Sequence, residues 1–135
     1  MKITLRSTAD ELGYVAANDR GQVARFSGSK QDVSPMEHLL MAAAACSAID
    51  VELLLAKMRQ RVTRVEVEAE GERADAVPAV FTRMRMHYRV YGDVKPEKAA
   101  KAVAMSMDQY CSVTQTLRGN VAVEHSVEVV AEAVG

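Results

Sequence analysis

The sequence has little of what marks several specialised classes of protein. Aromatic residues make up 4% of its 135 residues, tryptophan is absent, and the formal net charge is −1. The sequence contains no cluster of lysine and arginine residues. The charge of the chain therefore favours neither nucleic acid nor an anionic membrane as a partner. The two cysteines, Cys46 and Cys111, lie far apart and lack the C-x-x-C spacing of a zinc site. We therefore expect no disulfide framework and no metal or other cofactor.

Long apolar runs and nucleotide-binding motifs are also lacking. The longest uninterrupted apolar run, Leu39–Cys46, is too short to span a bilayer. The first residues, MKITLRSTADELGY, carry charges where a signal peptide has an apolar core. Neither G-x-G-x-x-G nor G-x-x-x-x-G-K occurs. These absences predict a single domain over residues 1–135, in the cytoplasm, with reduced thiols and no nucleic acid or membrane partner.

The most distinct segment present is Ser34–Gln60, which is apolar on most sides. Ser34 can cap a helix, Pro35 suits its first position, and Glu37 completes the spacing of a capping box. No glycine or proline interrupts the residues that follow. A helix that is apolar on most sides must be buried on most sides. We therefore predict a central helix wrapped by a sheet, or by a sheet and a partner chain.

The remaining pattern predicts an α+β fold with an antiparallel sheet. The segments with strand character are Met1–Arg6, Gly13–Asn18, Gln22–Phe26, Val62–Ala74, Phe81–Tyr91 and Val121–Ala131. Val62–Ala74 carries a row of glutamates and Phe81–Tyr91 a row of arginines. If these two strands are antiparallel neighbours, the two rows would pair across them. Pro96 opens a second helix that reaches about Tyr110. Ser112 and Gln115 have the spacing of another capping box, which predicts a short helix ending near Leu117.

The two cysteines have different predicted surroundings. Cys46 shares its side of the central helix with apolar residues and with Asp50. Burial and a nearby carboxylate both raise the pKa of a thiol. If Ser112 caps the short helix, Cys111 instead precedes a helix N-terminus, which favours a thiolate. This reasoning gives Cys111 the lower pKa. A plain core role is the favoured alternative for Cys46 and stays open for Cys111.

A Cys-His hydrolase is a further alternative. The histidines His38, His87 and His125 are its candidates, although none is adjacent to a cysteine in the sequence. A lone histidine on a helix or strand usually has a structural role.

Two segments together resemble the cysteine motifs of the OsmC/Ohr superfamily, the osmotically induced protein C and organic hydroperoxide resistance proteins. They are SPMEHLLMAAAACSAIDV (Ser34–Val51) and YCSVTQTL (Tyr110–Leu117). The resemblance covers the whole chain in element order. It is closer to the less characterised OsmC-like branch, because the peroxidases have N-P-E and C-P where this chain has S-P-M-E and C-S. The family implies an intertwined homodimer with two long helices packed back to back.

The resemblance also implies an activity, the thiol-dependent reduction of organic hydroperoxides or hydrogen peroxide in defence against oxidative stress. Cys46 would attack the peroxide as a thiolate and become a sulfenic acid. Cys111 would condense with it to a disulfide, and an external dithiol reductant would restore both thiols. This pairing needs Cα atoms within about 4.4–6.8 Å.

The sequence departs from the peroxidases at two points that concern activation. Their glutamate directly follows the proline, whereas Met36 holds that place here and Glu37 comes one later. Glu37 is a candidate catalytic residue, but helix geometry puts it opposite Cys46 and favours a capping role. Arg20 and Arg25 are the arginines that could take the place of the family's thiolate-stabilising arginine, and a cation of a partner chain is the alternative.

Two other functions stay open. One is a non-catalytic dimer that binds a small apolar or thiol-reactive ligand, and the other is a structural dimer with inert cysteines.

Overall fold

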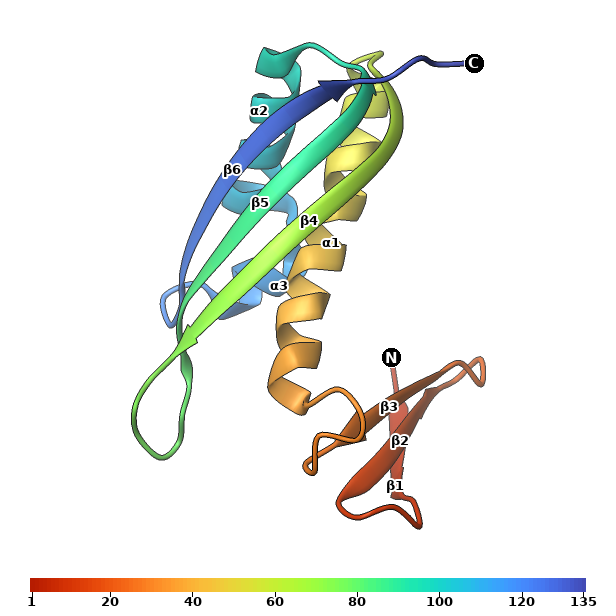
Figure 1. The fold of residues 1–135 in the computed structure, drawn as a ribbon, viewed down its shortest axis with the longest axis vertical. Coiled ribbons are helices and arrows are strands. Elements are labelled where there is room, and N and C mark those ends of the chain that lie inside the picture. Colours follow the sequence, from red (N-terminus) through yellow and green to blue (C-terminus); the bar gives the residue numbers. More distant parts are fainter. The chain divides into compact units, whose positions relative to one another are not determined.

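The computed structural model describes residues 1–135, and its contacts divide the chain into two compact units, Met1–Leu39 and Leu40–Gly135 (Figure 1). The prediction of one domain stays a prediction. The first unit contains an antiparallel sheet of β1 (Ile3–Ser7), β2 (Gly13–Asn18) and β3 (Val23–Ser27). The predicted hairpin between β2 and β3 is confirmed. The Asn18 side chain closes its turn by accepting hydrogen bonds from the backbone amides of Arg20 and Gln22, both at 3.0 Å.

The helix α1 (Pro35–Lys57) begins as the sequence predicts. The Ser34 amide donates to Glu37 Oε1 and the Glu37 amide donates to Ser34 Oγ, each at 3.1 Å. This is the reciprocal pair of a capping box. Its hydrogen bonds hold the pKa of the Glu37 carboxyl below its ordinary value.

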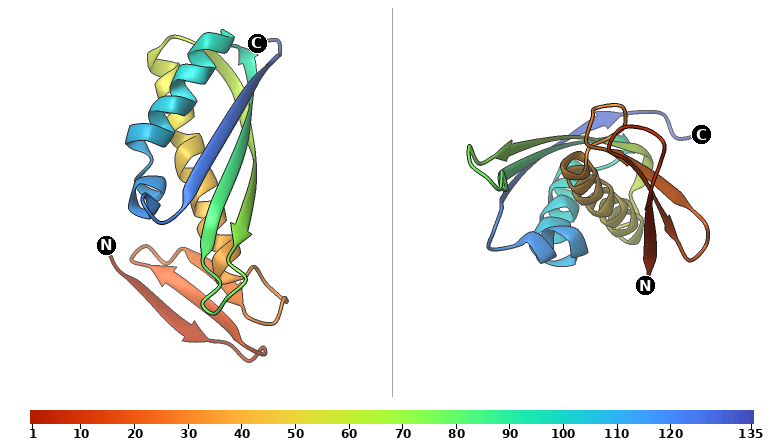
Figure 2. Two further views of the ribbon diagram at one scale, coloured as in Figure 1. Left: turned by 90° about the vertical axis from the view of Figure 1, so that its left-hand side faces the viewer. Right: turned by 90° about the horizontal axis from the view of Figure 1, so that it is seen from below.

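The second unit contains a sheet of order β4-β5-β6, formed by Arg61–Arg73, Phe81–Asp93 and Ala122–Ala131. β4 and β5 are antiparallel as predicted, but β6 pairs with β5 in parallel, so the prediction of a wholly antiparallel sheet is wrong. Between β5 and β6 the chain forms α2 (Pro96–Met105), the π-helical turn η1 (Ser106–Tyr110) and α3 (Ser112–Leu117). These helices return the chain to the start of β5, and such crossovers join parallel strands (Figure 2).

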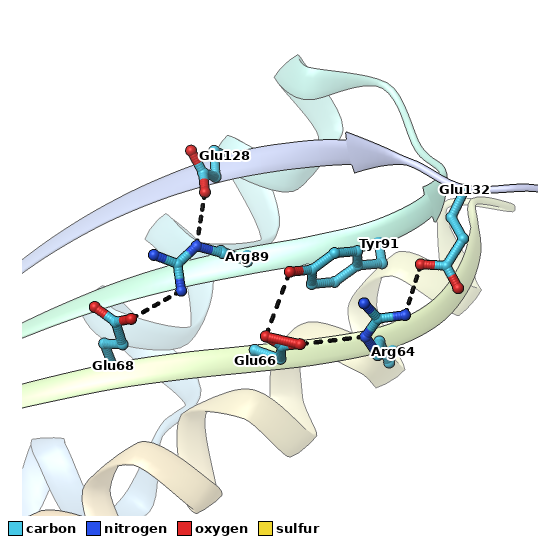
Figure 3. A network of polar contacts seen from close by, with 7 residues as sticks. All are labelled: Arg64, Glu66, Glu68, Arg89, Tyr91, Glu128 and Glu132. Atoms are coloured by element: carbon cyan, nitrogen blue, oxygen red, sulfur yellow. Dashed lines mark hydrogen bonds and ion pairs between the residues drawn. The ribbon is translucent and has the colours of Figure 1, made fainter.

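The polar face of this sheet carries the predicted rows of opposite charge. Arg89 on the central strand donates to Glu68 on β4 at 2.9 Å and to Glu128 on β6 at 2.8 Å (Figure 3). Arg64 reaches Glu132 at 2.7 Å. Because these pairs are exposed, solvent screening keeps the contribution of each to stability small. They fix the alignment of the strands more than they stabilise the fold.

The opposite face of the sheet packs against one stripe of α1. Met84, Met86, Tyr88 and Val90 of β5 are buried, and every fourth residue of α1 from Ala43 to Leu55 is buried as well. The rest of α1 is more open than predicted. Met41, Ile49 and Leu53 are 51%, 57% and 59% exposed. Within this chain, one side of the helix is covered and an apolar side is not.

By length and composition alone, α1 is apolar enough to cross a membrane, with a mean hydropathy of 2.0 over its best 18-residue window. A count of uninterrupted apolar residues does not detect this, because single polar residues interrupt the pattern. A core helix passes the same test. The stripe of α1 that packs on β5 is what a core helix requires.

Two substitutions on α1 test which side of the helix contributes most to the stability of the fold. Leu55 is fully buried, so Leu55→Ala should lower the free energy of unfolding by about 2–5 kcal/mol. The matched change Leu53→Ala, on the open side, should cost less than about 1 kcal/mol per chain. Urea denaturation at low protein concentration measures both. Equal losses would contradict this orientation of the helix.

Candidate functional site

The two cysteines come together in the second unit. Cys46 and Asp50 lie one turn apart on the same side of α1. Cys111 follows η1, where its amide donates to the carbonyl of Ser106, five residues earlier, at 2.8 Å. Its backbone is extended (φ −71°, ψ 107°), which ends the helical path. The two sulfur atoms and a carboxylate oxygen of Asp50 all lie within 4.8 Å of one another.

The two thiols differ in exposure. Cys46 is partly exposed, whereas Cys111 is fully buried. Burial raises the pKa of Cys111, and the neighbouring Cys46 raises it further, against opposing hydrogen bonds from Thr114. The pKa of Cys111 is therefore raised, whereas the sequence predicted that the helix after it would lower this pKa. Desolvation of a buried sulfur outweighs what a helix of six residues offers at its N-terminus.

The capping box predicted at Ser112 is also wrong. Cys111 itself occupies the N-cap position and Ser112 is the first helical residue. The Gln115 side chain, which the capping box would have used, instead donates to the carbonyl of Met107 at 2.9 Å. The π-helical turn moved the start of the short helix back by one residue, and the sequence pattern gave no sign of that turn.

A buried polar network surrounds the thiol pair. The Tyr88 hydroxyl donates to Ser47 Oγ at 2.6 Å, and Ser47 in turn donates to the carbonyl of Ala43 at 2.9 Å. Burial raises the pKa of Tyr88 to about 12, so this hydroxyl stays protonated. Ser106 donates to Asp50 Oδ2 at 3.1 Å. Sequence reasoning missed Ser47, Tyr88 and Ser106, although polar side chains within apolar helix faces were a signal that could have found the two serines.

A cavity of about 470 Å³ is lined by residues of α1, α2 and η1, and Asp50 is one of them. Its lining is mostly apolar with two lysines, and consists of Asp50, Leu53, Leu54, Lys57, Met58, Lys101, Met105 and Tyr110. Asp50 thus belongs to the cavity wall, and one of its carboxylate oxygens lies within 4.8 Å of both sulfurs. A molecule with an apolar body and a polar end suits such a lining.

The other predicted site residues make contacts within the first unit. Glu37 is the cap of α1. The Arg20 side chain donates to Gln22 at 3.2 Å, as expected of a turn residue, and the Arg25 side chain lies 3.5 Å from Asp32. His38 hydrogen-bonds the carbonyl of Arg25 at 2.7 Å. These contacts are structural, and a role of Glu37 or of either arginine in chemistry stays a prediction.

In the second unit, His87 hydrogen-bonds Ser126 at 2.7 Å on the polar face of the sheet and makes no hydrogen bond to a cysteine. His125 is exposed on β6. The second unit therefore offers no Cys-His hydrogen bond of the kind a hydrolase uses. Cys46, Asp50 and Cys111 are also close enough to share a metal ion, and zinc accepts thiolate and carboxylate ligands.

Comparison with known proteins gives a consistent match. The family model for OsmC-like proteins matches residues 28–126. Protein YhfA of Escherichia coli K12 is 47% identical over 121 residues, which cover 89% of this chain and 90% of that protein. A hypothetical protein from Aquifex aeolicus VF5 is 26% identical with a TM-score of 0.89, covering 97% and 96% of the two chains. An organic hydroperoxide resistance protein OsmC from Legionella pneumophila shares the fold at 17% identity, with a TM-score of 0.73 and coverage of 96% and 98%.

The unequal burial of the thiols predicts unequal labelling. Iodoacetamide at pH 7 should modify Cys46 at least roughly tenfold faster than Cys111, since a raised pKa leaves less thiolate and burial limits access. Labelling of Cys111 should increase as the pH rises. Peptide mass mapping measures both rates, and the urea-unfolded protein, in which the rates should converge, is the control. Faster labelling of Cys111 in the folded protein would contradict this assignment.

Proposed function

The chain belongs to the OsmC-like protein family, and on this premise we propose that it is a thiol-dependent hydroperoxide reductase. One observation carries the proposal. Two cysteines that are distant in the sequence lie with their sulfur atoms within 4.8 Å, one partly exposed and one buried. The names of two solved structures with this fold, from Legionella pneumophila and Bacillus subtilis, refer to organic hydroperoxide resistance, which supports the same substrate class by analogy.

Exposure supports the order of the two steps. A peroxide reaches the partly exposed Cys46 first and oxidises it to a sulfenic acid. The buried Cys111 then attacks the sulfenic sulfur and forms a disulfide. An S–S bond is about 2.05 Å long, so the sulfurs have to approach by less than about 3 Å. An external dithiol, in a reducing cytoplasm, returns both thiols.

The cavity favours an organic hydroperoxide over hydrogen peroxide. Its walls of leucine and methionine would hold an apolar substituent, and Asp50, which lines it, lies within 4.8 Å of both sulfurs. Hydrogen peroxide has no part that would gain from such contacts.

The same proposal includes a homodimer. Met41, Ile49 and Leu53 leave an apolar face on α1 that the chain itself does not cover. A second copy would bury it with its own α1, as the sequence resemblance implies. Exposed apolar faces of this kind mark interaction sites.

A second candidate function is a ligand-binding dimer without turnover. It is favoured by the cavity and by the absence of any ion pair between a cation and the residues of the thiol site. It would show a ligand-dependent rise in Tm with no consumption of peroxide.

Cysteine variants test the reductase. Reduced wild-type protein should consume tert-butyl hydroperoxide repeatedly in the presence of dithiothreitol, and Cys46→Ser should abolish this. Cys111→Ser keeps the attacking thiol, so it should complete the first step and accumulate a sulfenic acid that dimedone traps. A stopped-flow assay with intact-mass analysis measures each step. Unchanged consumption by Cys46→Ser would rule out the proposed mechanism.

A charge on the open face of α1 tests the dimer. Ile49→Lys should shift the protein from dimer to monomer, because a lysine on this face would be desolvated in the interface. Val77→Lys, at a fully exposed position in the loop between β4 and β5, is the control and should leave the mass unchanged. Sedimentation velocity measures both, and a wild-type protein that is monomeric at micromolar concentration would exclude the dimer.

A further inference from the structure

The charge around the thiol pair is unusual for a site that needs a thiolate. Thiolates are normally stabilised by a nearby cation or a helix N-terminus. Here a carboxylate oxygen of Asp50 lies within 4.8 Å of both sulfurs. The ion pairs of this chain lie elsewhere, on the polar face of the sheet and in the first unit, and none includes Asp50.

Several groups face Asp50 from the elements packed around it. They are Cys46 and Lys57 on α1, Lys101 on α2, Ser106 and Tyr110 on η1, Cys111 after it, and Tyr88 on β5. The two lysines line the cavity without pairing with the carboxylate. Ser106, which is fully buried, fixes one carboxylate oxygen through its 3.1 Å hydrogen bond. A carboxylate held this way repels a thiolate, but it is well placed to accept a thiol proton.

We propose that Asp50 is the proton carrier for both steps of the thiol reaction, which rests on the proposed reductase function. In the first step the Asp50 carboxylate takes the proton of Cys46 as the sulfur attacks the terminal oxygen of the hydroperoxide. An S–O bond forms and the O–O bond breaks. Sulfur is oxidised by two electrons and the peroxide is reduced by two. The leaving alkoxide takes the proton from Asp50 and departs as an alcohol.

The second step uses the same carboxylate. Cys111 gives its proton to Asp50 while its sulfur attacks the sulfenic sulfur of Cys46. The S–S bond forms, the S–O bond breaks, and the leaving hydroxide takes the proton and becomes water. The position of Asp50 suits both steps, because a carboxylate oxygen lies within 4.8 Å of both sulfurs and Asp50 also lines the cavity from which a substrate would enter.

Asp50→Asn separates this role from a merely electrostatic one. If the carboxylate only repels the thiolate, its removal should speed every reaction of Cys46. If it carries the proton, its removal should slow the reaction with tert-butyl hydroperoxide by about 10²–10⁴-fold. Alkylation by iodoacetamide also needs the Cys46 proton to leave, but the leaving iodide needs no proton, so alkylation should slow much less than the reaction with the alkyl hydroperoxide. Peracetic acid, whose carboxylate leaving group is stable without a proton, should lose much less rate than the alkyl hydroperoxide.

The experiment uses the full chain as a single-turnover, stopped-flow reaction of reduced protein, with a chelator present to keep metal ions off the thiols. Glu52→Gln removes the same charge from an exposed position of α1 and should leave all three rates unchanged. Asp50→Glu keeps the carboxylate and should recover part of the lost rate.

The three rates distinguish a proton-carrying role of Asp50 from a structural role and from the absence of any reductase activity. Equal or faster reaction of Asp50→Asn with the alkyl hydroperoxide would overturn the role of Asp50 and leave the reductase function intact. Equal losses with both oxidants and with iodoacetamide would reveal a structural defect and would also overturn it. If the wild-type protein reacts with neither oxidant, the proposed reductase function is wrong. The role of Asp50 as proton carrier is then wrong as well.

Discussion

The packing of α1 on β5 through a single stripe of small and aliphatic residues is the contact on which the second unit depends. The stripe brings Ser47 within 2.6 Å of the Tyr88 hydroxyl, which places one buried hydrogen bond inside an otherwise apolar contact. Leaving either partner unsatisfied would cost about 1–3 kcal/mol, so this bond restricts how the helix can rotate on the sheet. Because Cys46 is adjacent to Ser47 in the chain, the same restriction sets the direction of the thiol.

The second constraint is the π-helical turn that ends the helical path of α2. It places Ser106 and Cys111 against α1, so that a hydroxyl from one segment holds the carboxylate of the other at 3.1 Å. Single π-helical turns occur frequently at functional sites. Here the turn brings two segments that are distant in the sequence together as one group of two thiols and a carboxylate, with one sulfur partly exposed and the other buried.

Parts of the fold and the site were predictable from local pattern. The start of α1 follows from Ser34, Pro35 and Glu37, since capping depends on residues three positions apart. The pairing of β4 with β5 follows from alternation and from rows of opposite charge, which are local as well. Family membership followed from the two cysteine motifs. Asp50 beside Cys46 was also predictable, because helix geometry alone places residues four apart on one side.

The sequence by itself thus determined the elements, the helix cap, the family and the neighbours of Cys46 along its own helix. Only the tertiary structure decided that β6 runs parallel to β5, that Cys111 is buried with a raised pKa, and that both thiols share Asp50. The reason is common to all three. Strand direction, desolvation and contact between distant segments depend on how the crossover after β5 returns to the sheet, and no short-range pattern of residues encodes that path.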